Sequence, residues 1–348
     1  KAINFAYYDQ LTKLPNRAYF LDKVESLINK GSHCDGGFCI LFSDLNRFKS
    51  INDSRGHATG DMVLEKIARR LEKVITPKDT IARIGGDEFV FIHENTTSSS
   101  IESLGMLISE AVEKPMNING EQISIGISIG VSVWPEDGKS IDDILSHADI
   151  AMYNAKNNGD KLVRYNSNIG NDFRREVEIS EKLRTAISKN QFYIVYQPKF
   201  NLKTNETIGM EALLRWRNNS FKDVSPNEFI PIAEKHNLMW DIGLWCIEKV
   251  CEDIKKWHLS GISIPGRVSI NISIVQIENP IFFDTIVEII NKHSLSINLF
   301  ELELTESTLM SNPELVMETI HKLRSLGVCI SIDDFGTGFS SLAYLKRL

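Results

Sequence analysis

Acidic residues stand where strand-like runs begin or end in the first half of the sequence. Asp44 closes the apolar run FCILFSDL, and Asp87, with Glu88 beside it, follows a Gly-Gly pair between IARI and FVFI. Because such runs are buried in a sheet, carboxylates at their ends need a partner of positive charge. If the two strands are neighbours, Asp44 and Asp87 meet at one edge of the sheet. Carboxylate oxygens in this arrangement suit Mg²⁺, which takes one or two protein carboxylates together with substrate phosphates.

The glycine pair, Gly85 and Gly86, fits a tight turn that lets a phosphate approach the backbone. Two divalent ions held there can activate an attacking hydroxyl and stabilise a leaving pyrophosphate. The sequence contains no GxxxxGK[ST] segment, so a P-loop nucleotide site is not expected. Taken alone, an acid at a turn is usually a solvated surface group. His57, in RGHATGD, is expected to start a helix or to pack rather than to act as a base.

The segments that must position these acids alternate between helical and strand-like patterns. Helical spacing of apolar residues occurs in RAYFLDKVESLINK, with Asn16 as its N-cap, and in GDMVLEKIARRLEKVI, IESLGMLISEAVEKP and SIDDILSHADIAMYNAKNNG. FCILFSDL and ISIGISIGVSVW read as strands, and the Gly-Gly pair reads as the turn of a hairpin. This mixture predicts an α+β sheet with helices on its faces.

The second half has a different rhythm. The strand-like runs FYIVYQPKF, IGMEALLRW, RVSINIS, FELELTES and VCISIDDF recur, each expected to be followed by a helix, and most end near a carboxylate or amide. In a (β/α)₈ barrel the active site lies at the C-terminal ends of the strands, where these polar residues would gather. The polar segment NSNIGNDFRREVEIS separates the halves, so we expect a linker at residues 166–182, helical from Asp172.

Composition limits the classes of function. The 348 residues, 42% of them hydrophobic, suffice for two domains, and the net charge of −7 without a basic block argues against a DNA or RNA partner. The five cysteines are odd in number and form no CxxC pair, which favours reduced thiols and a cytoplasmic chain. No apolar run reaches the roughly 20 residues of a membrane span. Because the sequence begins at Lys1, we expect a longer parent protein, with an upstream sensor and a possible membrane tether.

The GGDEF segment at Gly85–Phe89 matches the signature of the GGDEF diguanylate cyclase family. DQLTKLPNRAYF, SDLNRFKSINDSRGHATGD, SIGVSVWPEDG and ADIAMYNAKNNG resemble further family motifs in the same order. We therefore take residues 1–165 as a GGDEF domain. The resemblance implies a palm-like α+β fold with a ferredoxin-like core, in which two GTP condense to cyclic di-GMP with two Mg²⁺ (or Mn²⁺) ions per active site. Since each domain binds one GTP, it also implies a homodimer.

The resemblance assigns roles to residues at matching positions. The metal site and catalytic edge correspond to Asp44, the carbonyl of Leu45, Asp87 and Glu88. In the family, the residue at Asp87 assists deprotonation of the 3′-hydroxyl. The substrate contacts correspond to Asn52, Asp61, Gly85, Gly86 and Lys156. Asn52 and Asp61 resemble guanine readers, which fits the chemistry because a carboxylate accepts from the N1 and N2 hydrogens of guanine.

This sequence departs from the family pattern at several positions. Asn46 stands where a second aspartate is usual, and Asp160 stands where an arginine usually binds phosphate. An acid near a triphosphate is repulsive unless a cation intervenes, a part that Lys161 is placed to take. The family's RxxD product-inhibition motif reads TPKD here, with Thr76 in place of arginine and Asp79 retained. We expect no tight feedback site there.

EALLRW, at Glu211–Trp216, resembles the signature of the EAL family of cyclic di-GMP phosphodiesterases, and YQPKF, SPNEFIPIAEKHNL, SINIS, LELTES and SIDDFGTGFSSLAYLKRL follow the family order. The resemblance covers residues 183–348 and implies a TIM-type barrel that hydrolyses cyclic di-GMP to pGpG with two Mg²⁺ or Mn²⁺ ions. The implied metal ligands are Glu211, which is also catalytic, Asn271, Glu303, Glu306, Asp333 and Asp334. The implied substrate contacts are Gln197 and Arg215, the latter suited to phosphate.

The EAL family continues past the equivalent of Leu348 with strands that bear a catalytic lysine and a further glutamate. We therefore expect an incomplete barrel and no phosphodiesterase activity in the printed chain. Three functions stay open at this point. The chain is an enzyme of bacterial cyclic di-GMP turnover, its GGDEF half is a GTP-binding regulatory module for the EAL half, or it is a non-catalytic cyclic di-GMP receptor.

Overall fold

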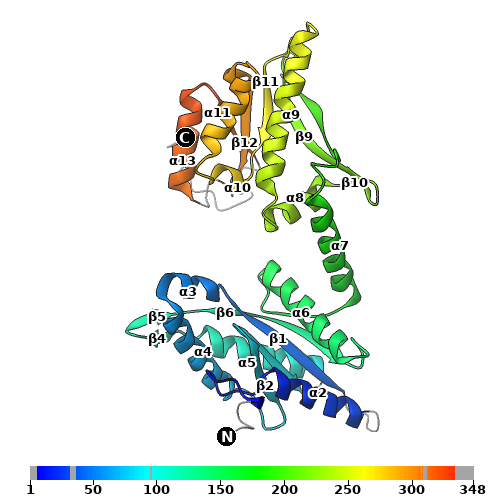
Figure 1. The fold of residues 1–348 in the computed structure, drawn as a ribbon, viewed down its shortest axis with the longest axis vertical. Helices are drawn as coiled ribbons and strands as arrows, with labels where there is room; N and C mark the ends of the chain where they lie inside the picture. Colours follow the sequence, from blue (N-terminus) through cyan, green and yellow to red (C-terminus); the bar gives the residue numbers. More distant parts are fainter. Residues whose placement is uncertain (1–5, 32–36, 95, 307, 309–311, 334–348) are drawn as a thin grey trace. The chain divides into compact units, whose positions relative to one another are not determined.

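The computed structural model describes residues 6–31, 37–94, 96–306, 308 and 312–333. The chain divides into two compact units, and the boundary lies between Arg175 and Glu176. Helix α7 (Ser167–Leu183) runs across this boundary (Figure 1). It begins before the expected Asp172, because the Asn166 side chain accepts hydrogen bonds from the amides of Asn168 and Ile169 and so caps its first turn.

The first unit is built on a mixed five-stranded sheet in the order β2-β3-β1-β6-β7. The strands are β1 (Phe38–Asn46), β2 (Thr80–Gly85), β3 (Glu88–His93), β6 (Gly126–Trp134) and β7 (Leu162–Arg164). The central strand β1 pairs antiparallel with both β3 and β6, and β7 joins β6 in parallel. This is the predicted α+β palm, with the end of β1 beside the start of β3.

Helices cover both faces of this sheet (Figure 1). They are α2 (Arg17–Gly31), α3 (Phe48–Arg55), α4 (His57–Leu71), α5 (Ser98–Glu113) and α6 (Ile141–Asn158). Successive side chains of a strand point to opposite faces, so β1 divides the core in two. Leu41 is buried with Ile67 of α4 and Ile108 of α5, whereas Ile40 is buried with Phe20 of α2 and Ala148 of α6.

Two local features fix helices next to the site. Asn16 caps α2 as expected, since its side chain accepts from the amides of Ala18 and Tyr19 at 2.9 and 3.2 Å. Helix α6 packs closely on β6 at Gly130, where a Cβ would lie 2.0 Å from the Met152 nitrogen. Only glycine permits this approach, which sets the position of the whole α6 helix.

One expected strand proved to be two. ISIGISIGVSVW contributes Ile123 to β5 (Glu121–Ile123), which pairs with β4 (Met116–Ile118) in a separate hairpin, and β6 begins only at Gly126. The alternation of side chains continues through Ser124 and Ile125, so the period of the sequence cannot show where the chain passes from the hairpin into the central sheet.

The second unit contains a six-stranded sheet in the order β10-β9-β11-β12-β13, with β8 on β9. Its strands are β8 (Phe192–Phe200), β9 (Thr207–Asn218), β10 (Lys222–Val224), β11 (Arg267–Asn271), β12 (Phe300–Thr305) and β13 (Cys329–Asp333). The strands β9, β11, β12 and β13 are parallel neighbours, as a TIM-type barrel requires. Their C-terminal ends therefore lie along one edge of the sheet.

The helices of this unit are α8 (Pro226–Lys235), α9 (Met239–Leu259), α10 (Ile274–Ile277), α11 (Phe282–Lys292) and α13 (Pro313–Ser325), with a 3₁₀ turn η1 (Ile297–Leu299). Ile254, Ile286 and Ile320 of α9, α11 and α13 are buried in one core with Ile270 of β11. The expectation that a helix follows every strand was wrong for β8. It turns directly into β9, and the Asn201 amide donates to the Glu206 carbonyl at 2.9 Å.

No helix within the described part of the chain is both long and apolar enough to cross a membrane.

Candidate functional sites

The acids of the first unit meet as the sequence predicts. Asp44 of β1 lies directly opposite Glu88 of β3, and the Leu45 amide donates to the Asp87 carbonyl at 3.4 Å. Gly86 and Asp87 form the two-residue turn between β2 and β3, and Gly86 has a positive φ of 44°. The antiparallel pairing of β1 and β3 thus brings three carboxylates from distant segments to one edge.

This edge carries an excess of negative charge. Burial and then the charge of Asp44 raise the pKa of Asp87. Burial also raises the pKa of Glu88, with further contributions from Asp149 and Asp44. Lys156 of α6 forms an ion pair with Asp44, and its side chain is 43% exposed. One ammonium among several carboxylates leaves a net charge that a divalent cation would satisfy.

Asp149 is a member of this cluster that sequence reasoning did not single out. It lies two turns before Lys156 on α6, a spacing that places both residues on one face of the helix. Partial burial and the charge of Asp44 raise the pKa of Asp149. The helical period of ADIAMYNAK, in which Lys156 was already a candidate, is the signal that could have found it.

Arg83 holds the Gly-Gly turn and was also missed. Its guanidinium donates to the Gly86 carbonyl from Nε and Nη2 at 3.0 and 2.7 Å, and Nη1 pairs with Asp9 Oδ1 at 2.9 Å. Thr12 donates to the same Asp9 oxygen through its amide and hydroxyl. The DQLTKLPNR segment therefore braces the turn that presents Asp87.

The predicted guanine readers lie on the helices that follow β1. Asn52 is on α3, and Asp61 is on α4 beside Gly60. A Cβ at position 60 would lie 2.0 Å from Asn52 Oδ1, so glycine there allows α4 to approach the Asn52 amide of α3.

The departures from the family pattern have structural consequences. Asp160 is exposed directly after α6, and Lys161 pairs with Glu113 of α5 at 2.7 Å. The expectation that Lys161 compensates for Asp160 at the phosphates stays a prediction. Asn46 accepts a hydrogen bond from the Ser128 hydroxyl at 3.0 Å and so faces β6.

Asp79 of the TPKD segment is tied into the fold. Its side chain is only 2% exposed, accepts from the amide and hydroxyl of Thr76, and pairs with His93 Nδ1 at 2.6 Å. Burial by itself raises the Asp79 pKa, but these hydrogen bonds outweigh it and hold the pKa below its usual value. With both oxygens engaged inside the protein, Asp79 is unsuited to bind a ligand.

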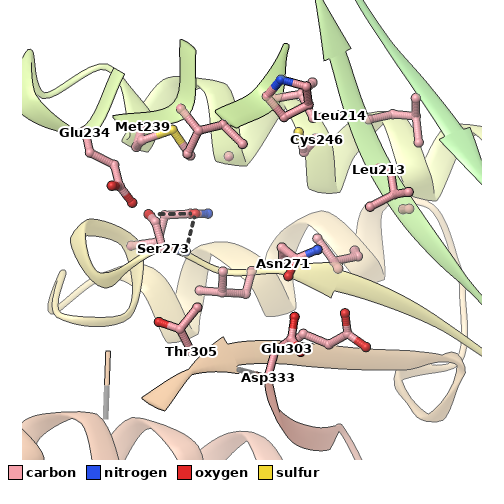
Figure 2. Close-up of a pocket in the computed structure, with 18 of the residues that line it drawn as sticks. Leu213, Leu214, Glu234, Met239, Cys246, Asn271, Ser273, Glu303, Thr305 and Asp333 are labelled. Atoms are coloured by element: carbon pink, nitrogen blue, oxygen red, sulfur yellow. Dashed lines mark hydrogen bonds between the residues drawn. The ribbon is translucent and has the colours of Figure 1, made fainter. Parts of the chain in front are cut away.

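The second unit gathers polar side chains at the C-terminal ends of its parallel strands. Asn271 lies opposite Glu303 in the β11–β12 pair, and Asn271 Nδ2 donates to Glu211 Oε1 at 2.8 Å. Figure 2 shows Asn271, Glu303 and Asp333 facing a common space. They line a cavity of about 360 Å³, which Arg215 also lines.

Of the other predicted residues of this unit, Arg215 lines that cavity, whereas Gln197 and Glu306 are not among the residues that line it. Gln197 is exposed and stands opposite Glu211 in the β8–β9 pair. Arg215 donates to the carbonyl of Leu214 at 2.9 Å, and Glu306 is buried directly after β12. Asp334 lies outside the described residues.

The donor chemistry of both sites fits a divalent cation that substrate helps to hold. Among the residues that the structure describes, no three His, Cys, Asp or Glu side chains are placed to hold a metal by themselves. Mg²⁺ accepts one or two carboxylates and takes its remaining oxygens from amides, carbonyls, water and phosphates. Asp44 and Asp87 with the Leu45 carbonyl, and Glu211 and Glu303 with Asn271, supply such incomplete sets.

The palm with its acidic turn and the parallel sheet with its acidic strand ends define a two-domain protein with a candidate divalent-metal site in each unit. The model of the family "Diguanylate cyclase, GGDEF domain" matches residues 6–162, and that of the "EAL domain" matches residues 180–348. The chain therefore belongs to the proteins that carry a GGDEF domain and an EAL domain in tandem.

Curated relatives share this arrangement. The chain is 36% identical over 347 residues to the bifunctional diguanylate cyclase/cyclic di-GMP phosphodiesterase MucR of Pseudomonas aeruginosa. This alignment covers 99% of the chain and 50% of MucR. It is 38% identical over 344 residues to the signaling protein YkoW of Bacillus subtilis, covering 98% of the chain and 43% of YkoW. The chain thus spans about half the length of these relatives.

A solved structure supports the fold. This structure is the S helix–GGDEF–EAL part of LapD from Vibrio cholerae, bound to c-di-GMP. The superposition covers 99% of this chain and 81% of the LapD chain, with a TM-score of 0.57 and 23% sequence identity. The likeness extends over both units and shows that the order of elements described above is that of a GGDEF–EAL pair.

Proposed function

We propose that the first half is a diguanylate cyclase, which condenses two GTP to cyclic di-GMP and two pyrophosphates. The observation that carries this proposal is the cluster of Asp44, Asp87 and Glu88 at the edge of the sheet, opposed by Lys156. Mg²⁺ or Mn²⁺, two ions per site, would be held by Asp44, Asp87 and the Leu45 carbonyl. The ions supply electrostatic stabilisation of the triphosphate and of the leaving pyrophosphate.

The chain's own residues perform the remaining tasks. Asn52 and Asp61 bind the guanine edge, and the Gly85–Gly86 turn, braced by Arg83, lets the phosphates approach the backbone. Lys156, which pairs with Asp44 in this structure, would contact phosphate. Asp87 accepts the proton of the attacking 3′-hydroxyl, and Glu88 supports the same edge. Because one domain binds one GTP, two copies of the chain must face each other for the reaction.

For the second half we propose a phosphodiesterase-type site. Glu211, Asn271, Glu303 and Asp333, with Glu306 and Asp334, supply the oxygen donors for Mg²⁺ or Mn²⁺, and Gln197 and Arg215 bind the cyclic di-GMP phosphates and sugars. In the whole protein this site would hydrolyse cyclic di-GMP to pGpG. We place the protein in the cytoplasm, where GTP and Mg²⁺ are available, with an upstream sensor domain.

One observation favours a second function for the first half. Asp160 occupies the place of a phosphate-binding arginine, and Lys161 is engaged by Glu113. A domain of this kind can bind GTP without turning it over and regulate the EAL half instead. Asp160→Arg separates the two functions, because restoring the cation should raise turnover only if the remaining site is catalytically competent.

The proposal is tested by incubating the chain with GTP and Mg²⁺ and measuring cyclic di-GMP by mass spectrometry. Wild type should form product, and Asp87→Asn should abolish it. Asp142→Asn, which removes an exposed acid of α6, is the matched control and should leave turnover unchanged. GTP binding without product would favour the regulatory function, and product from Asp87→Asn would refute the metal assignment.

A further inference from the structure

Lys199 connects β8 to the carboxylates of the second site. Its ammonium donates to the Ser269 hydroxyl at 2.6 Å, forms an ion pair with Glu301 Oε1 at 3.4 Å and contacts Glu303 Oε1. The side chain of Glu303 is 10% exposed and that of Lys199 is 34% exposed. The Lys199 ammonium is therefore partly removed from solvent. Its positive charge is compensated by Ser269 of β11 and by Glu301 and Glu303 of β12.

The register explains why a residue of β8 reaches this far. Lys199 lies opposite Gly209 of β9, a position without a side chain that could block its path. Ser269 and Glu301 are paired neighbours, and Asn271 and Glu303 are the next pair that points to the same face. Lys199 thus reaches the layer of Ser269 and Glu301, which is one layer closer to the N-terminal ends of the strands than Asn271 and Glu303.

The contact is specific to one oxygen of Glu303. Lys199 contacts Oε1 of Glu303, and Glu303 also lines the cavity that it shares with Asn271 and Asp333 (Figure 2). Asn271 is oriented in a similar way, because its Nδ2 donates to Glu211 and its Oδ1 stays available as a ligand. Carboxylates that bind metals are commonly oriented by such a second hydrogen bond.

We propose that Lys199 is the positioning residue that holds Glu303 with Oε1 turned away from, and Oε2 turned towards, the divalent cation of the second site. The inference rests on the metal site proposed for the EAL half. It does not make Lys199 a ligand, since an ammonium has no lone pair to donate.

A purely electrostatic role predicts the opposite result. Burial raises the pKa of Glu303 and Lys199 lowers it, so the comparison is made at a pH high enough to keep Glu303 ionised in every variant. There a fixed positive charge beside Glu303 only repels a divalent cation, so its removal alone should tighten metal binding. Loss of a positioning partner weakens metal binding, typically by about 10- to 100-fold. The direction of the change therefore distinguishes positioning from simple charge compensation.

The experiment measures Mn²⁺ binding to the full chain by the electron paramagnetic resonance signal of free Mn²⁺. All variants carry Asp87→Asn, which removes a proposed ligand of the first half. Glu303→Gln reports whether the measured site is the proposed one. Lys199→Met removes the contact, and Lys199→Arg retains the charge and the ability to donate. Lys203→Met removes an exposed lysine in the turn after β8 and serves as the matched control.

We expect Glu303→Gln to abolish the binding, Lys199→Met to weaken it about 10- to 100-fold and Lys199→Arg to restore part of the loss. Lys203→Met should bind as wild type. Unchanged or tighter binding by Lys199→Met overturns the positioning role while the metal site stands. Binding that is insensitive to Glu303→Gln overturns the metal site itself and, with it, this inference.

Circular dichroism and hydrogen exchange of β8 peptides verify that the variants fold. If Lys199→Met unfolds, Lys199→Ala, which also lacks a donor, takes its place. Lys199→Ala should bind Mn²⁺ about 10- to 100-fold more weakly than Lys203→Met, and binding within about twofold of Lys203→Met would overturn the role.

Discussion

Replacement of Arg83 should loosen the turn that presents Asp87. Arg83 is 12% and Asp9 24% exposed, and three hydrogen bonds link Arg83 to Asp9 and the Gly86 carbonyl. A hydrogen bond to a charged group contributes about 1.5–3 kcal/mol when its loss leaves the partner unsatisfied. Because Gly86 is exposed and water can replace its bonds, we count mainly the Asp9 contact and expect Arg83→Met to cost about 2–3 kcal/mol.

Native-state hydrogen exchange of peptides from β2 and β3 measures this cost locally in the full chain. A loss of about 2–3 kcal/mol corresponds to exchange that is about 30- to 150-fold faster. Arg69→Met is the matched control, because Arg69 is 75% exposed and pairs with Glu65 at 3.4 Å within one helix. Such a pair contributes about 0.3–0.5 kcal/mol.

The effect should also depend on pH. Burial alone raises the Asp9 pKa, but hydrogen bonds from Thr12 and Arg83 outweigh it and hold the pKa below its usual value. A carboxyl whose pKa is lower in the folded than in the unfolded state stabilises the fold at pH values above its unfolded-state pKa. This contribution is lost as the pH falls through the folded-state pKa. The difference between wild type and Arg83→Met should therefore shrink below about pH 4. Equal exchange rates for Arg83→Met and Arg69→Met at neutral pH would refute the bracing role.

Three further predictions concern the first unit. Gly130→Ala should lower the free energy of unfolding by about 1–3 kcal/mol in thermal unfolding, because the added Cβ would lie 2.0 Å from the Met152 nitrogen and displace α6. It should also lower GTP turnover, and unchanged turnover would contradict the placement of Lys156. Gly60→Ala should raise KM for GTP about tenfold with little change in kcat, since the added Cβ would clash with the movable Asn52 amide. Steady-state kinetics with an unaltered KM would exclude Asn52 as a guanine reader. Asp79→Ala should leave cyclic di-GMP affinity unchanged in isothermal titration, because the Asp79 side chain is 2% exposed and already bonded. Micromolar binding that depends on Thr76 or Asp79 would show a feedback site.

The parts that the sequence predicts well are those fixed by short-range signals. The Gly86–Asp87 turn joins β2 and β3 as a hairpin, although the register shifts between Arg83 and Gly85, and the apolar run that ends in Asp44 reads as a buried strand. Once both belong to one sheet, their acids meet at its edge. Helix α6 is equally clear from the sequence, because Ser140 and Asp143 form a capping box and Gly159 ends the helix.

The remainder depends on contacts between distant residues. Arg83 and Asp9 are 74 positions apart, and Lys199 is 104 positions from Glu303, so no local pattern indicates that they pair. The break at Ser124 keeps the alternation of a continuous strand and therefore has no signal in the sequence. The pairing of Lys161 with Glu113 likewise depends on the packing of α5 against β7, where a Cβ at Gly105 would lie 2.1 Å from Leu162 Cδ1.

The most direct test of the central claim follows the fate of GTP. The chain and its Asp87→Asn variant are incubated with GTP and Mg²⁺, and cyclic di-GMP and pyrophosphate are quantified together over time. The proposed cyclase predicts two pyrophosphates for each cyclic di-GMP, a rate that rises more steeply than linearly at low protein concentration, and no product from Asp87→Asn. GTP that binds to the wild-type chain and is recovered intact would contradict it.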